Sequence, residues 1–148
     1  THERIYEGFL SDTFDKTFTH GHSYTANPLG CAAALASLAL LTQDQTLEKI
    51  KIIQSLHEER ISQLETTGLG QHSRVCGTIA AIDFPLINRQ YGNSLSHLLK
   101  QRFLEAGLNI RPLGNVIYLM PPYCITPAQL HDAYDLIEKI LKSFCTDL

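Results

Sequence analysis

Several features that would place this chain in a specialised class of protein are missing from its 148 residues. No uninterrupted apolar run is long enough to cross a bilayer, and the first residues lack the apolar segment of a signal peptide. Lysine and arginine (12) do not exceed aspartate and glutamate (15), so there is no basic footprint for nucleic acid. No repeat or low-complexity segment is present. These absences favour a globular chain with no nucleic-acid or membrane partner.

Paired cysteines and clustered metal ligands are also missing. The four cysteines stand far apart at positions 31, 76, 124 and 145, and none forms a Cys-x-x-Cys pair. A chain of this size can hold a core without disulfides, so we expect reduced thiols and a cytoplasmic protein. Cys31, inside an alanine- and leucine-rich run, is expected to pack as a small apolar residue. His20 and His22 have no third ligand at a nearby spacing, so no metal site is predicted.

The composition is that of an ordinary folded chain. Apolar residues make up 44% and charged residues 18%, with a mean hydropathy of −0.06. The length fits one compact domain or one part of something larger. The first residue is Thr1 instead of methionine, which is compatible with a piece of a longer protein.

Apolar spacing predicts five helices. The expected ranges are residues 3–10, 28–41, 45–65, 94–106 and a last helix from 127. Asn27 and Pro28 are a typical N-cap and first residue, and the run LGCAAALASLALL that follows is apolar almost all round, which indicates a buried helix. Thr126 and Gln129 form a capping box for the last helix.

Three segments are predicted to be strands: residues 74–84, with Gly77 as a bulge, then 108–111 and 116–120 on either side of a turn. The order of elements predicts an α+β fold, a small, mainly antiparallel sheet covered by helices.

Two segments carry residues suited to binding anions. The first, HGHSYTANPLGCAAALASL (residues 20–38), is a glycine-containing loop with hydroxyls that runs into a helix N-terminus. Loop amides and the Ser23 hydroxyl suit a phosphate, although such a loop more often serves only as a polar N-cap.

The second segment is NIRPLGNVIYLMPPY (residues 109–123). Arg111 ends a short apolar stretch just before a rigid Pro-Leu-Gly-Asn turn, so its guanidinium could present a fixed fork to a carboxylate. Taken alone, an ordinary surface ion pair is the simpler interpretation.

Together the two motifs resemble those of the class III, pyridoxal-phosphate-dependent aminotransferases, and the resemblance runs over essentially the whole chain. It implies the C-terminal small domain of a fold type I transferase (residues 44–148) plus the end of the large cofactor-binding domain (residues 1–43). The second motif narrows the resemblance to the branch that transfers an amino group from S-adenosylmethionine to 8-amino-7-oxononanoate, giving 7,8-diaminononanoate in biotin biosynthesis.

The resemblance also implies roles for individual residues. In such homodimers the loop matching Gly21, His22 and Ser23 reaches the neighbouring subunit and binds the phosphate of its pyridoxal 5'-phosphate through backbone amides and a hydroxyl. The position of Gly21 lies against the substrate, and Arg111 binds the carboxylate of the small-molecule substrate. Some relatives carry proline where His22 stands, so no side-chain role is assigned to it.

The lysine that forms the Schiff base with the cofactor belongs to sequence upstream of the segment matched here. The lysines of this chain stand in loops or amphipathic helices and match no such motif. We therefore expect no catalytic lysine in this chain, and a fragment that is inactive alone. Two alternatives stay open: another class III aminotransferase acting on an omega-amino acid or a diamine, and a non-catalytic dimerising module. Roles for His20, Tyr118 and Tyr123 are also open, since all three could simply pack.

Overall fold

A computed structural model describes residues 2–87 and 94–146 of the chain. The chain divides into two compact units, Thr1–Leu40 and Leu41–Leu148, called here the N-terminal and C-terminal units. No helix within the described residues is long and apolar enough to span a membrane.

The N-terminal unit carries short elements and one regular helix. They are α1 (Glu3–Glu7), a 3-10 turn η1 (Phe14–Lys16) and most of α2 (Pro28–Leu41). The bounds predicted for α2 are confirmed, but its predicted burial is wrong, because no residue of α2 is buried. Cys31 is likewise exposed, contrary to the expectation that it packs. All described residues of this unit, 2–40, are exposed, so this part of the chain provides no core against which α2 or Cys31 could pack.

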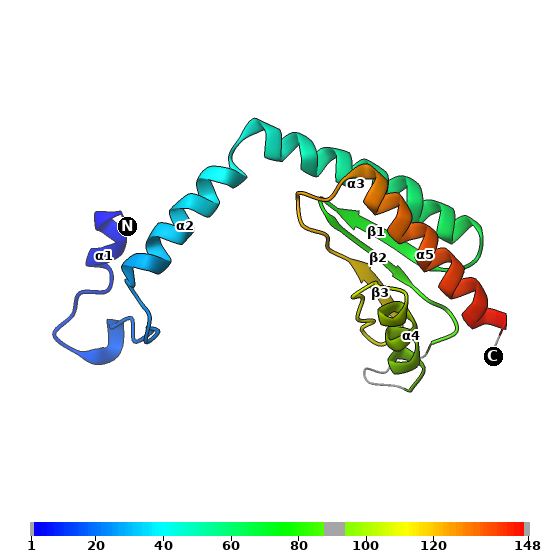
Figure 1. Ribbon diagram of the computed structural model, residues 1–148. Coiled ribbons are helices and arrows are strands. Elements are labelled where there is room, and N and C mark those ends of the chain that lie inside the picture. Colours follow the sequence, from blue (N-terminus) through cyan, green and yellow to red (C-terminus); the bar gives the residue numbers. More distant parts are fainter. Residues whose placement is uncertain (1, 88–93, 147–148) are drawn as a thin grey trace. The chain divides into compact units, whose positions relative to one another are not determined.

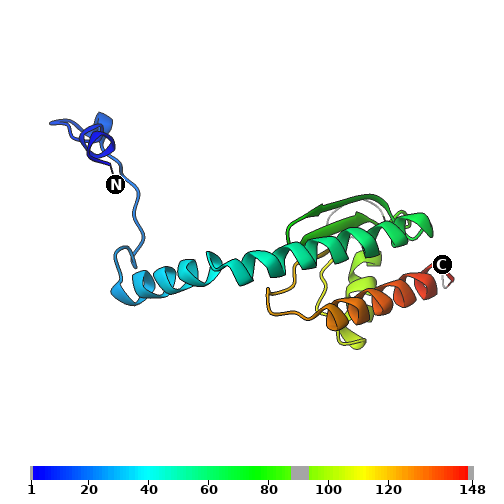
Figure 2. The same ribbon diagram turned by 90° about the horizontal axis from the view of Figure 1, so that it is seen from above.

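The C-terminal unit is an α+β domain, as predicted. Its elements are α3 (Asp44–Thr66), β1 (Gln71–Cys76), β2 (Ile79–Asp83), α4 (Ser94–Glu105), β3 (Val116–Leu119) and α5 (Pro127–Thr146). The strands form one antiparallel sheet in the order β1-β2-β3. Helix α3 packs on β1 and β2, while α5 packs against α3 and α4 (Figures 1 and 2).

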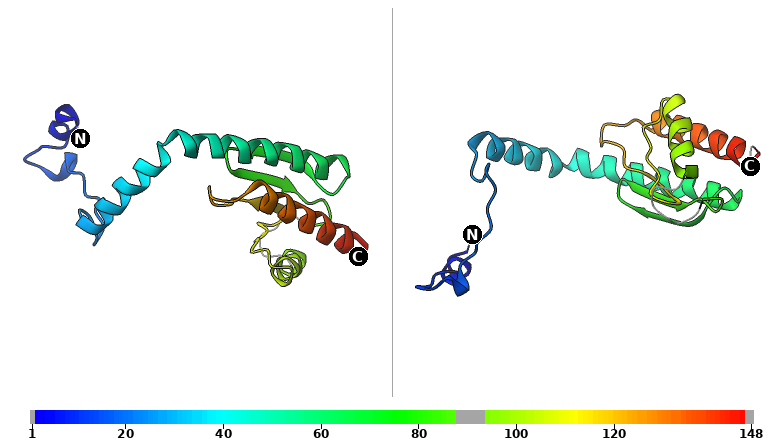
Figure 3. Two further views of the ribbon diagram at one scale, coloured as in Figure 1. Left: turned by 45° about the horizontal axis from the view of Figure 1, so that its top comes forward. Right: turned by 90° about the horizontal axis from the view of Figure 1, so that it is seen from below.

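The core lies between the sheet and these helices. In Figure 3 α3 and α5 run in similar directions, and the two helices contact each other. The largest fully buried side chains come from strands and helices that are distant in sequence: Tyr134, Phe84, Phe103, Phe144, Ile82, Leu99, Ile117, Leu130, Ile137, Leu141 and His57. Their burial holds the sheet and the helices in one layered unit.

The single strand expected over residues 74–84 is wrong, since the segment folds back as a hairpin. Cys76 pairs with Ile79, so Gly77 and Thr78 form a two-residue turn between β1 and β2. Gly77 has φ of 57°, a conformation that tight hairpin turns favour at their first position and that glycine adopts without strain.

The strand expected over residues 108–111 is also absent. Helix α4 ends in a Schellman motif, in which the amides of Gly107 and Leu108 donate to the carbonyls of Leu104 and Phe103. At the other end of the segment 108–111 stands Pro112, which has no N–H to donate to a neighbouring strand. The segment therefore crosses the domain as irregular chain, and the turn after it closes through the pair Leu113 and Val116.

The capping box predicted for the last helix is confirmed. The amide of Gln129 donates to Thr126 Oγ1 at 3.2 Å, and the amide of Thr126 donates to Gln129 Oε1 at 3.0 Å. This cap fixes the start of α5 beside the cavity described next.

Candidate functional site

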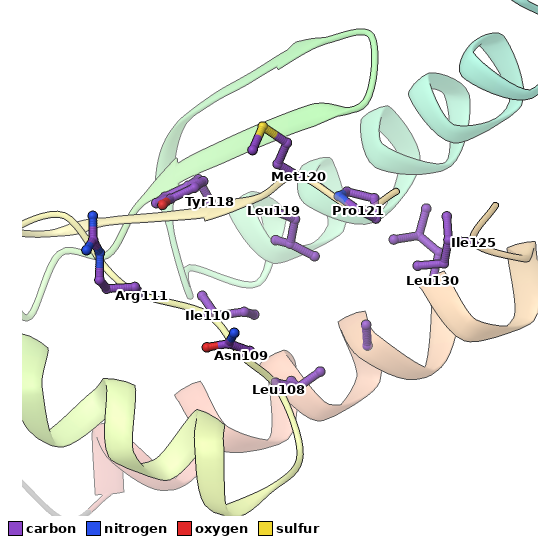
Figure 4. A pocket seen from close by; sticks show the side chains of 11 residues that line it. Leu108, Asn109, Ile110, Arg111, Tyr118, Leu119, Met120, Pro121, Ile125 and Leu130 are labelled. Atoms are coloured by element: carbon purple, nitrogen blue, oxygen red, sulfur yellow. The ribbon is translucent and has the colours of Figure 1, made fainter. Parts of the chain in front are cut away.

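An open cavity of about 460 Å³ lies in the C-terminal unit beside β3 (Figure 4). Its walls come from the irregular segment after α4, from β3 and the residues that follow it, and from α5. Most of the lining side chains are apolar: Leu108, Ile110, Leu119, Met120, Pro121, Ile125, Leu130 and Ala133. Such a cavity suits a ligand with an aliphatic body.

Among the residues that the structure describes, Arg111 is the only positively charged one that lines this cavity. Its side chain is exposed, and within the described residues its guanidinium makes no ion pair or hydrogen bond. In Figure 4 Arg111 and Tyr118 stand at one end of the cavity, and Ile125 and Leu130 at the other. The simpler interpretation of Arg111 as part of a surface ion pair therefore has no support in the described part of the chain. A guanidinium with free donors at the end of an apolar cavity can bind a carboxylate by donating two parallel hydrogen bonds to it.

The two tyrosines of the second motif differ in position. Tyr118, in β3, is half-buried and lines the cavity beside Arg111, whereas Tyr123 lies outside the cavity lining and is 43% exposed. Tyr118 can thus contact a ligand in the cavity, while nothing ties Tyr123 to this site.

The loop of the first motif is exposed and lies in the N-terminal unit. Aromatic rings at alternate positions pack in sequence along it: the ring centroids of His20 and His22 are 4.8 Å apart, and those of His22 and Tyr24 are 5.0 Å apart. His20 is thus a packing residue of this row. No group of three or more His, Cys, Asp or Glu side chains among the described residues is placed to hold a metal ion.

The loop offers hydrogen-bond donors at Ser23. Within the described residues, neither the Ser23 amide nor its hydroxyl has a hydrogen-bond partner. The amide of His22, by contrast, donates to Thr25 Oγ1 at 2.7 Å. Of the two residues predicted to hold a phosphate, Ser23 therefore has a free backbone amide, whereas the backbone amide of His22 is already engaged.

Gly21 is open on the side where a side chain would stand. A Cβ placed on it would meet nothing within 4 Å, and its backbone does not require glycine. Within the described residues, neither the backbone nor a neighbouring atom requires glycine at this position. That is compatible with a ligand lying against Gly21.

Sequence reasoning missed two residues that shape this loop. Thr25 accepts the hydrogen bond from His22, and Ala26 has φ of 60°, in the left-handed region that disfavours side chains. The sequence signal that could have identified Thr25 is its hydroxyl, which stands three residues after the His22 amide and can accept from it in a local turn. Asn27, identified as the N-cap, accepts from the amides of Leu29 and Gly30 through Oδ1, at 3.0 and 3.2 Å.

No lysine of the chain resembles a buried, activated amine. All six are exposed, among them Lys16 in the N-terminal unit and Lys49 in α3. A lysine that reacts with a carbonyl group usually needs desolvation or a neighbouring cation to release its proton near neutral pH. None of the six lysines has such an environment in this structure.

The model of the family "Aminotransferase class-III" matches residues 2–141, and the chain belongs to this family. The family uses pyridoxal phosphate, and the free donors of Ser23 fit its phosphate group.

Two curated relatives of this chain share one description. The adenosylmethionine-8-amino-7-oxononanoate aminotransferase of Synechococcus elongatus is 46% identical over 144 residues, covering 94% of this chain and 32% of that protein. The enzyme of the same description from Geobacter sulfurreducens is 38% identical over 147 residues, covering 93% of this chain and 32% of that protein. The chain thus spans about a third of the length of these relatives.

Solved structures show the same fold. The crystal structure of the Methanocaldococcus jannaschii adenosylmethionine-8-amino-7-oxononanoate aminotransferase matches with a TM-score of 0.78 and 29% identity, covering 97% of this chain and 34% of that one. An acetylornithine aminotransferase from Elizabethkingia anophelis matches with a TM-score of 0.70 and 32% identity, covering 84% of this chain and 31% of that one.

Proposed function

We propose that this chain is the C-terminal part of a pyridoxal-phosphate-dependent aminotransferase of biotin biosynthesis. The intact enzyme would transfer an amino group from S-adenosylmethionine to 8-amino-7-oxononanoate and release 7,8-diaminononanoate. The observation that carries the proposal is Arg111, unpaired within the described residues, at one end of an apolar cavity. The relatives of the same description support it.

In this proposal Arg111 anchors the substrate carboxylate. The acceptor substrate is an aliphatic chain that ends in a carboxylate, so its body would lie along Leu119 and Leu130 while the carboxylate meets the guanidinium. Arginine suits this task better than lysine, since its planar fork forms two parallel hydrogen bonds with a carboxylate. Tyr118 would line the same end of the cavity.

The loop would hold the cofactor phosphate of a neighbouring subunit in a homodimer. Ser23 would donate from its amide and hydroxyl, and Gly21 would leave room for the substrate. His22, whose amide donates to Thr25, would contribute only by holding the loop around Ser23 in shape. The bound cofactor supplies the electron sink for amino transfer. The division into a large-domain end (residues 1–43) and a small domain (residues 44–148) is part of the same proposal.

We propose further that the protein is cytoplasmic and that this chain does not catalyse amino transfer by itself. All its lysines are exposed, so none is set up to bind the cofactor covalently. Purified chain mixed with pyridoxal phosphate should show no visible absorbance from lysine-bound cofactor after removal of the excess. A stable band that disappears when one lysine is replaced would contradict this part of the proposal.

A chimera tests the main proposal. The matching C-terminal third of the Synechococcus elongatus relative is replaced by this chain, and the product is expressed in a bacterial strain that needs biotin because it lacks this aminotransferase. The chimera should restore growth without biotin. In the purified chimera, Arg111→Ala should raise KM for 8-amino-7-oxononanoate about 30-fold or more, because a charge that anchors a carboxylate is lost.

Matched variants sharpen this result. Arg111→Lys should retain part of the affinity, and Arg4→Ala, an exposed arginine of α1, should leave KM unchanged. An Arg111→Ala chimera with an unaltered KM would remove the carboxylate anchor from the proposal.

A second candidate function is that of a class III aminotransferase with a different substrate, an omega-amino acid or a diamine. The similarity to an acetylornithine aminotransferase supports this candidate. The purified chimera can be supplied with S-adenosylmethionine, ornithine derivatives or omega-amino acids as donor. The main proposal requires turnover with S-adenosylmethionine, and turnover only with another donor favours the second candidate.

A third candidate function is that of a non-catalytic dimerising module. The exposed apolar residues of α2, among them Leu29 and Leu35, support this candidate. A sizing column distinguishes a defined dimer of the isolated chain from a monomer. A stable dimer together with a chimera that fails to restore growth would favour this candidate.

A further inference from the structure

The loop of the first motif contains a turn closed by two hydrogen bonds that run in opposite directions. The amide of His22 donates to Thr25 Oγ1 at 2.7 Å, and the amide of Thr25 donates to the carbonyl of His22 at 2.9 Å. His22 and Thr25 are therefore the ends of the turn, and Ser23 and Tyr24 are its two central residues. One of the two bonds depends entirely on the Thr25 side chain.

The second bond decides which groups of the turn are free. It engages the His22 amide, while the amide and hydroxyl of Ser23 keep their donors free among the described residues. The rings of His22 and Tyr24 stack at an interplanar angle of 17°, so the side chains on either side of Ser23 pack on each other. Within the described residues the hydroxyl and the amide of Ser23 are thus both available to a ligand, at the centre of the turn.

The turn also leads directly into a second one. The amide of Asn27 donates to the carbonyl of Tyr24 at 3.0 Å, and Asn27 then caps α2. A loosened first turn would consequently change where Ser23 lies relative to the start of the helix.

We propose that Thr25 is a positioning residue for phosphate binding: its hydroxyl closes the turn that presents Ser23 to the phosphate of the cofactor. This inference rests on the proposed function, which assigns the phosphate to Ser23. The physical reason is preorganisation, since a turn already closed in the free protein has less conformational entropy to lose when the phosphate binds. Thr25 itself need not touch the phosphate.

Isosteric variants of the chimera test this role. Thr25→Val keeps the shape of the side chain but removes the acceptor, and Thr25→Ser keeps the acceptor. Thr25→Val should weaken the binding of pyridoxal phosphate about 3- to 10-fold, the equivalent of one hydrogen bond. Thr25→Ser should restore the binding, and Thr13→Val, which removes another exposed hydroxyl hydrogen bond of the same unit, should leave it unchanged.

Pyridoxal, which lacks the phosphate, provides a readout that a general loss of structure would not give. Equilibrium titrations should show that Thr25→Val weakens the binding of pyridoxal phosphate while the affinity for pyridoxal stays the same. Equal losses for both ligands, or no loss for either, would overturn the proposal.

Hydrogen exchange in the 148-residue chain tests the turn without any cofactor. Thr25→Val should speed the exchange of the His22 amide, and Thr25→Ser should keep it slow. Unchanged exchange in Thr25→Val would show that the side chain does not close the turn, and would also overturn the proposal.

Ser23→Ala separates this inference from the proposed function. Weaker binding of pyridoxal phosphate in Ser23→Ala with full affinity in Thr25→Val would leave the phosphate role of Ser23 standing and remove only the positioning role. Full affinity in Ser23→Ala would instead contradict the phosphate role on which both depend.

Discussion

The hydroxyl of Tyr134 in α5 donates to Nδ1 of His57 in α3 at 2.7 Å, and neither side chain has any solvent exposure. Nε2 of the same imidazole lies 3.2 Å from the carbonyl oxygen of Thr78. A carbonyl can only accept, so Nε2 carries the proton and Nδ1 is the acceptor for tyrosine. The pair therefore joins α3, α5 and the hairpin turn through one neutral histidine.

Tyr134→Phe should destabilise the chain by about 1–3 kcal/mol, because it leaves Nδ1 of His57 buried without a partner. Chemical denaturation followed by circular dichroism measures the loss. Tyr123→Phe is the matched control: Tyr123 is 43% exposed, and within the described residues its hydroxyl has no partner, so its stability should stay close to that of the original chain. Equal stabilities for the two variants would contradict a structural role for the pair.

The same histidine should make the chain sensitive to mild acid. Burial lowers the pKa of His57 below its ordinary value of 6.5, against the opposing effect of the hydrogen bond to Thr78. The unfolded chain then binds a proton more readily than the folded chain, so the free energy of unfolding should fall as the pH drops through about 6.5. Denaturation curves between about pH 7.5 and pH 5.5 measure this slope.

His57→Gln is the variant that isolates this effect, since glutamine does not titrate. It should be less stable at neutral pH but should show a flatter slope in the same interval. His97→Gln, which alters an exposed histidine of α4, should keep the slope. The carboxylate of Glu65 does not contribute to this interval: the Ser73 hydroxyl lowers its pKa, so the stability that it provides is lost only in stronger acid. An unchanged slope in His57→Gln would assign the acid sensitivity to another group.

The helices of this chain were predictable because their signals are local. Asn27 with Pro28, and Thr126 with Gln129, stand within a few residues of the amides that they cap. The hairpin was missed because residues 74–84 form a continuous strand-like run, and only the pairing of Cys76 with Ile79 separates a turn from a bulge at Gly77.

The position of His57 shows the same limit inside a helix. Helical spacing alone does not distinguish Leu56 from His57 as the core residue of that turn, since the polar partner that makes a buried histidine acceptable lies 77 residues away. The candidate site divides in the same way. The rigid turn after Arg111 made it a candidate, and only the family resemblance gave it the carboxylate role. The cavity beside it also needs Leu130 and Ala133 of α5, which no local pattern links to it.

Gly70→Ala should destabilise the C-terminal unit by about 1–3 kcal/mol through overpacking. A Cβ on Gly70 would lie 2.3 Å from Cδ1 and 2.5 Å from Cγ1 of Ile82, whose side chain is buried in the core and has little room to move. Thermal or chemical denaturation measures the change. In an Ile82→Ala background the colliding atoms are gone, so Gly70→Ala should cost much less there; the same cost in both backgrounds would exclude this collision.

Thr126→Ala should destabilise the chain by about 1 kcal/mol, because the amide of Gln129 at the start of α5 loses its acceptor. Thr146→Ala is the control at the other end of the helix. Its hydroxyl donates to the carbonyl of Lys142, so no amide loses its acceptor when that hydroxyl is removed. Chemical denaturation should place Thr126→Ala clearly below Thr146→Ala in stability, and the reverse order would contradict the importance of the capping box.

Ala133→Phe should block the cavity while leaving the fold intact. Ala133 lines the cavity from α5 and is half-buried, so a ring at this position can extend into open space. In the chimera the variant should raise KM for 8-amino-7-oxononanoate about 10-fold or more, because the aliphatic body of the substrate loses its place along the wall. Ala128→Phe, on the exposed side of the first turn of α5, should leave KM unchanged. Since Arg111 is intact in both variants, a raised KM in Ala133→Phe alone would show that the apolar wall contributes to binding separately from the carboxylate anchor. Equal KM values in the two variants would mean that the substrate does not enter this cavity.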